Sequence, residues 1–315
     1  MKPGNAERAA GPFAGRTLII INPAAGQEDP ARLRRLIGGA FAARRAPFDL
    51  VETTHAGHAV ELSREAAGLG YRAVCVVGGD GTLAEAATGL AGTDTPLALI
   101  PRGTANQVAH NLRIPTNLEE AVDVAINGEA APVDLGRIGD RVFALVAGAG
   151  FDAAVMASAT RGMKERWGFG AYVFAAVKEA LTAQPVDFRI TADGVTMEVR
   201  AVSVMLANVG ELFAHFLPFA LPLAPRPGRS WQDGLFDVVV LAPRNVIDVP
   251  NVLWKAMGRN YQSDDDRLLH FQAREVTIEA DPPIAVQIDG DPAGVTPVSA
   301  RAVERGVHII APALT

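Results

Sequence analysis

Glycines interrupted by one aspartate give the first sign of chemistry in this sequence. The apolar pair Val76-Val77 leads into the run Gly78-Gly79-Asp80-Gly81-Thr82-Leu83-Ala84-Glu85. This order predicts a buried strand, a glycine-rich turn and then a helix. Backbone N–H groups converge at a helix start, where the dipole is positive, and the missing side chains of glycine let a phosphate group come close. The run therefore predicts a phosphate-binding turn.

The same residues also fit an ordinary helix start. Thr82 and Glu85 have the spacing of a capping box, and such boxes occur in many helices that bind no ligand. Asp80 favours the phosphate interpretation, because a carboxylate among phosphate-facing glycines is repulsive unless a divalent cation or a transferable proton compensates it.

Three other polar turns follow apolar runs. They are Asn22-Pro23-Ala24-Ala25-Gly26, the turn Thr53 to His58, and Arg102-Gly103-Thr104-Ala105-Asn106. Each alone is an ordinary turn. Together they place polar, glycine-containing turns on one edge of a parallel sheet, which is where a nucleotide binds in open α/β folds.

The elements that must position these turns alternate between strand and helix. Buried strands are expected at 18–21, 48–51, 73–77 and 97–100, and helices at 30–43, 58–69, 83–90, 105–112 and 118–126. Such alternation implies a parallel sheet wound by crossovers, with ligands at the carboxyl ends of its strands.

The pattern changes after about Pro132. Turn pairs such as Gly139-Asp140 and Asp193-Gly194 separate strand-like runs, and one long helix is expected at 167–181. The runs predict an antiparallel β domain, a sandwich. The expected strands are 141–147, 186–192, 196–204, 235–241, 276–280 and 284–288.

Composition limits the class of protein. The chain has 315 residues, of which 49% are hydrophobic and 20% charged, so it should form about two globular domains and not a disordered chain. With 29 basic and 35 acidic side chains, the net charge of -6 disfavours a nucleic-acid partner, which needs a basic surface.

Cysteine and hydropathy indicate a cytoplasmic protein. The single cysteine, Cys75, cannot form an internal disulfide. Residues 1–16 carry no apolar signal-peptide core, and no uncharged apolar stretch approaches the roughly 18–20 residues of a spanning helix.

His55 and His58 are expected to be loop and helix-start residues, because no further His or Cys completes a metal cluster.

Taken together, the turn motifs resemble a known family. Asn-Pro-x-x-Gly at 22–26, Gly-Gly-Asp-Gly-Thr at 78–82 and Pro-x-Gly-Thr-x-Asn at 101–106 are similar to the motifs of the diacylglycerol kinase catalytic domain family. That family includes bacterial lipid kinases, sphingosine kinases and ceramide kinases. The resemblance continues through 148–152, 233–238 and 288–291, so it covers nearly the whole chain.

The resemblance implies a fold and a set of site residues. It implies a Rossmann-like α/β domain at 14–132, to which 302–315 return, a β-sandwich lipid-substrate domain at 133–301, and an ATP site in the cleft between them. Ser230, Asp233 and Leu235 match a magnesium site of bacterial members. The residues matching the nucleotide contacts are Asn22, Pro23, Ala24, Ala25, Gly26, Thr53, Gly79, Asp80, Gly81, Thr82, Leu83, Ala84, Glu85 and Thr104.

Two departures from the family pattern concern catalysis. Bacterial members commonly end the last motif with Asp-Gly-Glu and use the Glu as proton acceptor, whereas this chain has Asp291, which is one methylene shorter. In sphingosine kinases the proposed base corresponds to Asp80. Either Asp80 or Asp291 could therefore be the general base.

The second departure is Ala84, which stands where many members have Asn, so that one polar contact is removed.

A third departure concerns the acceptor. Residues 211–223, Glu-Leu-Phe-Ala-His-Phe-Leu-Pro-Phe-Ala-Leu-Pro-Leu, form an apolar, proline-containing insert. One interpretation is a buried connection against the sandwich. The other is a lip that contacts acyl chains or the bilayer interface, as a kinase acting on a membrane lipid requires.

These features predict an ATP- and Mg²⁺-dependent lipid kinase, with a diacylglycerol-like or sphingosine-like acceptor and a role in phospholipid biosynthesis. Such an enzyme would be cytoplasmic with peripheral contact at the inner face of the membrane. Two alternatives are an NAD kinase-like enzyme acting on a soluble nucleotide, and an inactive nucleotide-binding regulatory protein. The sequence leaves open the lipid head group and whether the chain forms a homodimer.

Overall fold

The chain forms two compact units. The computed structural model describes residues 12–26, 29–151, 153–154, 184–208, 211–212, 221–222, 230–243, 248 and 267–313. The first unit comprises Met1–Gly103, Leu112–Pro132 and Val307–Thr315, and the second comprises Thr104–Asn111 and Val133–Gly306. The chain passes into the second unit within β5 (Glu129–Ile138) and returns within β18 (Val298–Ala311).

The first unit is built on a parallel sheet, as predicted. Its strands β1 (Thr17–Ile21), β2 (Phe48–Glu52), β3 (Ala73–Gly78) and β4 (Leu97–Pro101) lie in the order β2-β1-β3-β4, with the end of β18 beside β4. Ile21 pairs with Glu52 and Val77, and Gly78 pairs with Pro101. The carboxyl ends of these strands therefore line up, which brings the turns that follow them to one edge.

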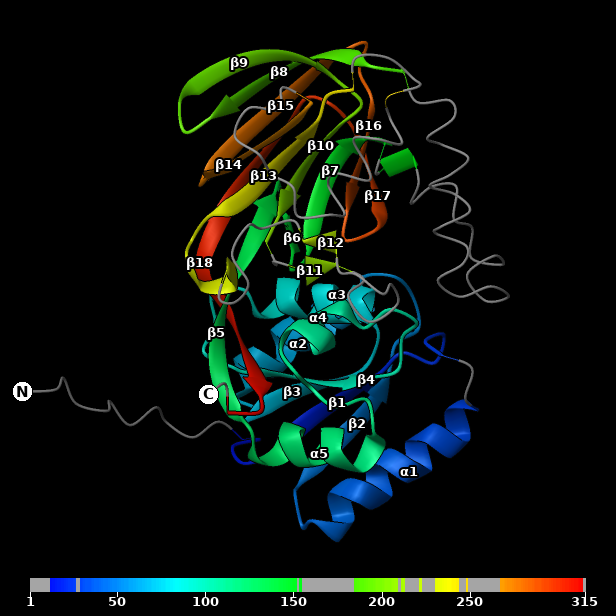
Figure 1. The fold of residues 1–315 in the computed structure, drawn as a ribbon. Helices are drawn as coiled ribbons and strands as arrows, with labels where there is room; N and C mark the ends of the chain where they lie inside the picture. The colour runs from blue at the N-terminus through cyan, green and yellow to red at the C-terminus, as the bar shows by residue number, and fades with distance from the viewer. Residues whose placement is uncertain are drawn as a thin grey trace, which may run out of the picture. The chain divides into compact units, whose positions relative to one another are not determined.

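Helices cover both faces of this sheet (Figure 1). α1 (Pro30–Ala43) and α5 (Leu118–Asn127) share one buried cluster with the sheet, in which Ile37 and Phe41 pack against Cys75 and Val77. α2 (His58–Leu69) and α3 (Asp80–Leu90) pack against each other on the other face. α3 begins three residues earlier than the apolar pattern indicated, because Asp80, Gly81 and Thr82 of the glycine-rich run are already helical.

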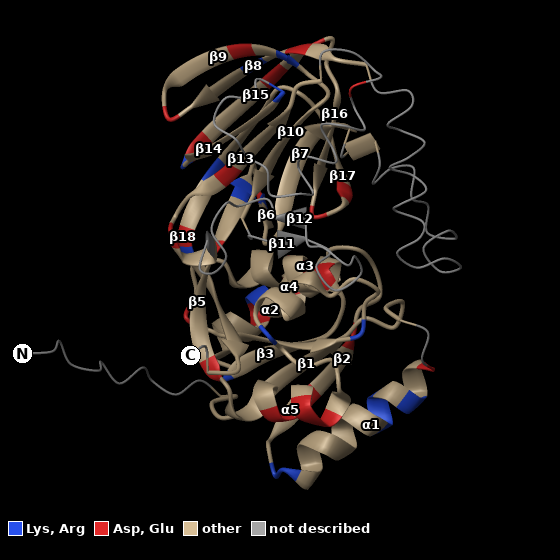
Figure 2. Ribbon diagram, in the orientation of Figure 1, with Lys and Arg blue, Asp and Glu red and all other residues tan. Residues whose placement is uncertain are grey.

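Caps and ion pairs define the ends of the α1–α5 layer. Asp29 precedes α1, and its carboxylate accepts a hydrogen bond from the Arg32 N–H in the first turn. The Asn117 side chain accepts from the N–H groups of Glu119 and Glu120 in α5. Arg44 contacts Asp123 at 2.6 Å and Glu119 at 2.9 Å. Figure 2 shows the same pattern, with basic residues on α1 and acidic residues on α5.

The second unit is an antiparallel β-sandwich, which confirms the predicted fold class. One sheet has the order β18-β15-β8-β9, with β5 pairing β18 and β6, and the other has the order β14-β13-β10-β7-β16-β17. A short helix, α4 (Gln107–Asn111), occupies the centre of the expected helix at 105–112. The strands are β6 (Arg141–Phe143), β7 (Val146–Gly150), β8 (Val186–Ala192), β9 (Val195–Ala201), β10 (Ser203–Ala207), β13 (Phe236–Leu241), β14 (Leu268–Ala273), β15 (Glu275–Asp281), β16 (Ala285–Ile288) and β17 (Asp291–Val295), with the two-residue pair β11 (Glu211–Leu212) and β12 (Leu221–Pro222).

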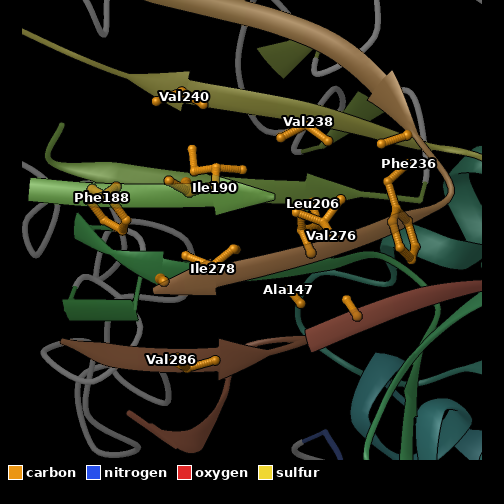
Figure 3. Packing of buried hydrophobic residues seen from close by; sticks show 14 of the residues in the cluster. Ala147, Phe188, Ile190, Leu206, Phe236, Val238, Val240, Val276, Ile278 and Val286 are labelled. Atoms are coloured by element: carbon orange, nitrogen blue, oxygen red, sulfur yellow. The ribbon is translucent and has the colours of Figure 1, made fainter. Parts of the chain in front are cut away.

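Alternating apolar side chains fill the space between the two sheets (Figure 3). Phe188 and Ile190 from β8 and Ile278 from β15 belong to the same buried cluster as Val238 and Val240 from β13. Burying each such side chain stabilises the fold by roughly 1.5–3 kcal/mol relative to leaving it exposed. The period of two along β8 and β15 explains why the sequence identified these strands.

Two strands predicted as continuous are interrupted. The predicted strand 196–204 divides into β9 and β10 at Val202, whose N–H donates to Leu241 O and whose carbonyl accepts from Phe151 N, both at 2.8 Å. β9 pairs with β8 and β10 with β13, so the chain changes sheets at this residue. The predicted strand 141–147 likewise divides into β6 and β7. The expected helix 167–181 lies outside the described residues.

The one cysteine is a core residue. Cys75 is fully buried, and burial raises the pKa of its thiol to about 12, so it has no thiolate character at neutral pH.

Among the described residues, no helix has the length and apolar composition needed to cross a membrane.

A charged network joins the starts of three strands in the first unit. Arg16 Nε donates to Asp49 Oδ2 at 2.7 Å, and the Tyr71 hydroxyl donates to the same oxygen at 3.0 Å. The hydrogen bond from Arg16 lowers the pKa of the Asp49 carboxyl. Burial, followed by the hydrogen bond to Asp49, raises the pKa of Tyr71 to about 12.

We predict that Asp49→Asn removes part of the acid sensitivity of the fold. Because the pKa of Asp49 is depressed in the folded state, its ionised form stabilises the protein above about pH 4, and this stabilisation is lost as the pH falls below that value. Urea unfolding at several pH values should show a weaker acid dependence in Asp49→Asn than in the wild type. Glu129→Gln, at an exposed position of the same unit, is the control, and equal acid dependence in all three proteins would contradict the assignment.

Candidate functional site

Asn22 joins the turn after β1 to the start of α3. Its Oδ1 accepts a hydrogen bond from the Ala24 N–H at 2.9 Å, and its Nδ2 donates to the Thr82 hydroxyl at 2.8 Å. Its own N–H donates to Val77 O at 3.1 Å, which ties the turn to the end of β3. The Asn-Pro-x-x-Gly turn and the glycine-rich turn are therefore held together by one side chain.

Glycines let the turns after β1, β3 and β4 come into close contact. Gly26 has a φ of +79°, and a Cβ there would lie 2.8 Å from Arg102 O. A Cβ on Gly79 would lie 3.0 Å from the Cα of Gly103. The Arg102 N–H donates to Gly78 O at 2.8 Å. A side chain at Gly26 or Gly79 would push these turns apart.

The N-cap residue of α3 has no side chain. It is Gly79, so it makes no side-chain cap hydrogen bond of its own to the first turn. Gly81 is exposed, and a Cβ built on it meets no heavy atom within 4 Å. The positive end of the helix is thus open on its glycine side, and a phosphate group fits the chemistry of this turn.

The capping-box interpretation of Thr82 and Glu85 is wrong. The Thr82 hydroxyl accepts from Asn22, and the Glu85 carboxylate accepts from the N–H groups of Gly57 at 2.8 Å and Ala59 at 3.2 Å. Glu85 therefore caps the neighbouring helix α2 and fixes the turn that precedes it. Its two oxygens are engaged in the fold.

The other predicted nucleotide residues differ in how they are placed. The Thr53 N–H donates to Ile21 O at 2.9 Å, which holds Thr53 at the same strand edge as Asn22. The Leu83 side chain is fully buried in the core, so only its backbone can meet a ligand. Ala84, the next residue in α3, is half-buried. Thr104 is the first residue of the second unit, and it is exposed.

In the last motif, the first aspartate has a structural role. Asp289 accepts hydrogen bonds from the N–H groups of Ala144 at 2.8 Å, Leu145 at 2.9 Å and Val146 at 2.9 Å. Three donated hydrogen bonds explain why the chain turns between β6 and β7 instead of continuing as one strand. Asp289 itself has a φ of +48°, a conformation that Asp tolerates better than most residues.

Asp291, the second aspartate of that motif, is held loosely. Its side chain is 71% exposed and lies 3.8 Å from Arg141 Nη2. It is the first residue of β17, directly after the Asp289-Gly290 turn. The carboxylate can therefore meet a substrate, in contrast to that of Asp289.

The predicted magnesium residues lie in one short segment of the second unit. Ser230 starts a 3₁₀ turn, and the Leu235 N–H donates to Asp233 Oδ1 at 3.0 Å. Gly234, between them, has a φ of +71° and donates to Asp134 Oδ2 at 2.7 Å. The buried Asp134 also accepts from the Arg305 N–H at 2.7 Å, so this turn is anchored to β18.

Asp233 lies in a region of concentrated negative charge. Burial raises the pKa of its carboxyl, the hydrogen bond from Leu235 opposes the rise, and the carboxylates of Asp237 and Asp134 raise the pKa further. A carboxyl whose ionised form is disfavoured by neighbouring carboxylates fits the donor set of a hard divalent cation.

Sequence reasoning missed several residues that support the site. Arg102 and Gly103 were part of a noted turn, but their backbone contacts with Gly26 and Gly79 were not expected. The roles of Asp134 and Asp289 were also missed, because their partners lie far away in the chain. The Asp-Gly pair of the last motif was the available signal for Asp289, since such pairs mark tight turns.

Two family models match consecutive parts of the chain. The model described as the diacylglycerol kinase catalytic domain matches residues 16–138. The model described as the YegS C-terminal NAD kinase beta sandwich-like domain matches residues 145–311. The two matches together span most of both units.

Relatives and solved structures agree with these matches. Diacylglycerol kinase from Mycobacterium tuberculosis H37Rv is 31% identical over 308 residues, covering 95% of this chain and 96% of that protein. Diacylglycerol kinase from Bacillus subtilis is 27% identical over 300 residues, covering 94% and 96%. A crystal structure from Bacillus anthracis, provisionally described as a diacylglycerol kinase, superposes with a TM-score of 0.77 at 26% identity, covering 95% of this chain and 98% of that one.

We predict that Asp289→Ala lowers the stability of the protein strongly, by about 2–4 kcal/mol, because three backbone N–H groups lose their acceptor. Asp289→Asn keeps one side-chain oxygen and should cost less. Asp291→Ala, two residues away and exposed, should leave the free energy of urea unfolding nearly unchanged. Similar losses in the Asp289→Ala and Asp291→Ala variants would contradict the anchoring role.

Proposed function

The chain belongs to the diacylglycerol kinase family, and from that premise we propose that it is an ATP- and Mg²⁺-dependent kinase that phosphorylates the hydroxyl group of a lipid such as diacylglycerol. The observation that supports this most directly is the convergence of three glycine-containing turns at the open start of α3. Such an arrangement offers backbone N–H groups and a positive helix end to a triphosphate.

The residues of this chain would act mainly by positioning. Asn22 fixes the two turns against each other, and the N–H groups at the start of α3 would orient the phosphates. Glu85 supports them indirectly, because it holds the turn before α2 in place. Bound ATP would supply the phosphoryl group, and Mg²⁺ would neutralise its charge.

Two carboxylates remain candidates for the general base. Asp80 is half-buried in the first turn of α3, and Asp291 is exposed at the start of β17. Either could accept the proton of the acceptor hydroxyl as the new phosphate ester bond forms and the bond between the γ-phosphorus and the departing ADP breaks. Asp289 is excluded from this role in our proposal, because its oxygens are hydrogen-bonded to backbone N–H groups.

The magnesium ligands that we propose are Asp233 and the backbone oxygens of Ser230 and Leu235. The raised pKa of Asp233 and the neighbouring carboxylates support a site that gains stability when a cation is bound. The hydrogen bond between the Gly234 N–H and Asp134 would hold the turn in shape in the absence of metal.

A lipid acceptor requires contact with a membrane surface. The apolar insert 211–223 is our candidate for this contact, on the basis of its composition, and its residues 213–220 and 223 lie outside the described residues. The names of the relatives, diacylglycerol kinases, support a diacylglycerol-like acceptor over NAD. The NAD kinase-like name of the second family model keeps NAD as the acceptor to test against.

We predict that ATP consumption depends on lipid and on Mg²⁺. The purified chain should consume ATP with diacylglycerol or a related lipid in mixed micelles, and should not do so with NAD. In the same assay, the base should be revealed by a loss of roughly 10²–10⁴-fold in kcat in either Asp80→Asn or Asp291→Asn. Turnover with NAD alone, ATP binding without any turnover, or near-normal rates in both variants would contradict the proposal.

We also predict that Gly81→Ala separates folding from nucleotide binding. A Cβ at Gly81 meets no heavy atom within 4 Å among the described residues, and alanine is favoured over glycine in a helix by about 0.5–1 kcal/mol, so stability should be kept or increased. If phosphates lie against this turn, ATP affinity measured by calorimetry should fall at least about tenfold.

The control for this variant is Gly68→Ala. Gly68 lies in α2, and a Cβ there also meets no heavy atom within 4 Å. It should raise stability to a similar extent without any change in ATP affinity. Unchanged ATP affinity in Gly81→Ala would count against a phosphate site at this turn.

A further inference from the structure

Two histidines and a glutamate beside the start of α2 form a cluster that the kinase proposal does not use. His55, His58 and Glu61 each offer one ligand atom, and the three atoms lie within 4.8 Å of one another. We propose that this cluster binds a divalent transition metal of the zinc type, with water completing the coordination.

The spacing of the three residues favours a shared ligand. His58 and Glu61 are three residues apart in the first turn of α2, which places them on one face of the helix. His55 stacks on His58 with ring centroids 4.7 Å apart and an interplanar angle of 22°. Glu61 is the third member of the cluster, and a pattern of His and Cys residues alone does not include it.

The separation of the ligand atoms is not far from that of a zinc site. In a tetrahedral zinc site, bonds of about 2.0–2.1 Å place neighbouring ligand atoms about 3.3 Å apart. The three atoms need only approach one another slightly, and His55 and Glu61 are exposed, so rotation of their side chains is not blocked by packing.

Hydrogen bonds to the other ring nitrogens orient the imidazoles. His55 Nδ1 lies 3.0 Å from Ala56 O, which can only accept, so Nδ1 carries the proton and Nε2 keeps its lone pair. Metal-bound histidines commonly have such a carbonyl partner. His58 Nδ1 lies 3.1 Å from the Thr54 N–H and 3.2 Å from the Thr54 hydroxyl.

For His58, metal binding selects between two tautomers. With a metal on Nε2, Nδ1 must donate its proton, and the Thr54 hydroxyl is the acceptor at hand. The Thr54 N–H then loses His58 Nδ1 as its acceptor, and water can take that place because Thr54 is exposed. Thr54 is therefore expected to be a positioning residue for the metal, acting through His58.

The charges around the cluster make Glu61 essential. The start of a helix is positive and repels a cation. At α2 this is offset in part by Glu85, which accepts from Gly57 and Ala59, and directly by the carboxylate of Glu61. Replacing Glu61 removes both a ligand and the charge that offsets the helix end, so we expect a larger effect than from loss of a neutral ligand.

The experiment is a titration of the full chain with ZnCl₂. The protein is prepared without a histidine tag, treated with chelator and studied by calorimetry without Mg²⁺ or nucleotide. We expect about one equivalent of Zn²⁺ to bind saturably, and Co²⁺ to give the intense visible absorption of a four-coordinate centre. The double variant His55→Ala/His58→Ala should lose both signals, and Glu61→Gln should weaken binding at least about tenfold.

The controls separate ligation from folding. Thr54→Ala should weaken Zn²⁺ binding about 10–100-fold, and Thr54→Ser, which restores the hydroxyl, should recover it. His110→Ala, at an exposed position on α4, should bind Zn²⁺ like the wild type. Absence of saturable binding, or equal binding in the double variant, would overturn the proposal. Because no Mg²⁺, nucleotide or lipid is used, either result leaves the kinase proposal untouched.

Discussion

The close approach of backbone segments at glycine is the constraint on which the candidate site depends. Gly26 and Gly79 lie where a Cβ would come within 2.8–3.0 Å of the turn after β4, and Asn22 bonds across to Thr82. These contacts are possible because β1, β3 and β4 are parallel and end at the same level. The sheet thus sets the positions of the turns and brings them together at the start of α3, where Gly81 is exposed.

The sequence predicted the elements whose patterns are local. Parallel strands such as β3 are short apolar runs, and α1 and α5 have helical spacing, so their bounds agree within a residue or two. β5, β14, β17 and most of β18 were not predicted. β18 carries Arg301, Glu304 and Arg305 among its apolar residues, and its pairing with β15 and β4 is a long-range property.

The candidate site, like the fold, could be predicted only where its pattern is local in the sequence. The glycine-rich turns were identified because glycine and Asn-Pro have direct backbone consequences. The partners of Glu85 and Asp289 could not be predicted, since they lie 28 and about 144 residues away in the chain. In both cases a carboxylate that resembles a functional group serves as an acceptor for backbone N–H groups. Among the acidic residues that the resemblance assigned to the site, Glu85 thus serves the fold, and Asp80, Asp233 and Asp291 are those that we propose for chemistry.

The claim that these turns receive phosphates is tested most directly by amide hydrogen exchange with and without MgATP. We predict slower exchange at residues 24–26 and 79–82 when the nucleotide is bound, because phosphates bound there would shield both turns from water. Unchanged exchange in both segments at saturating nucleotide, with protection only elsewhere in the chain, would contradict it.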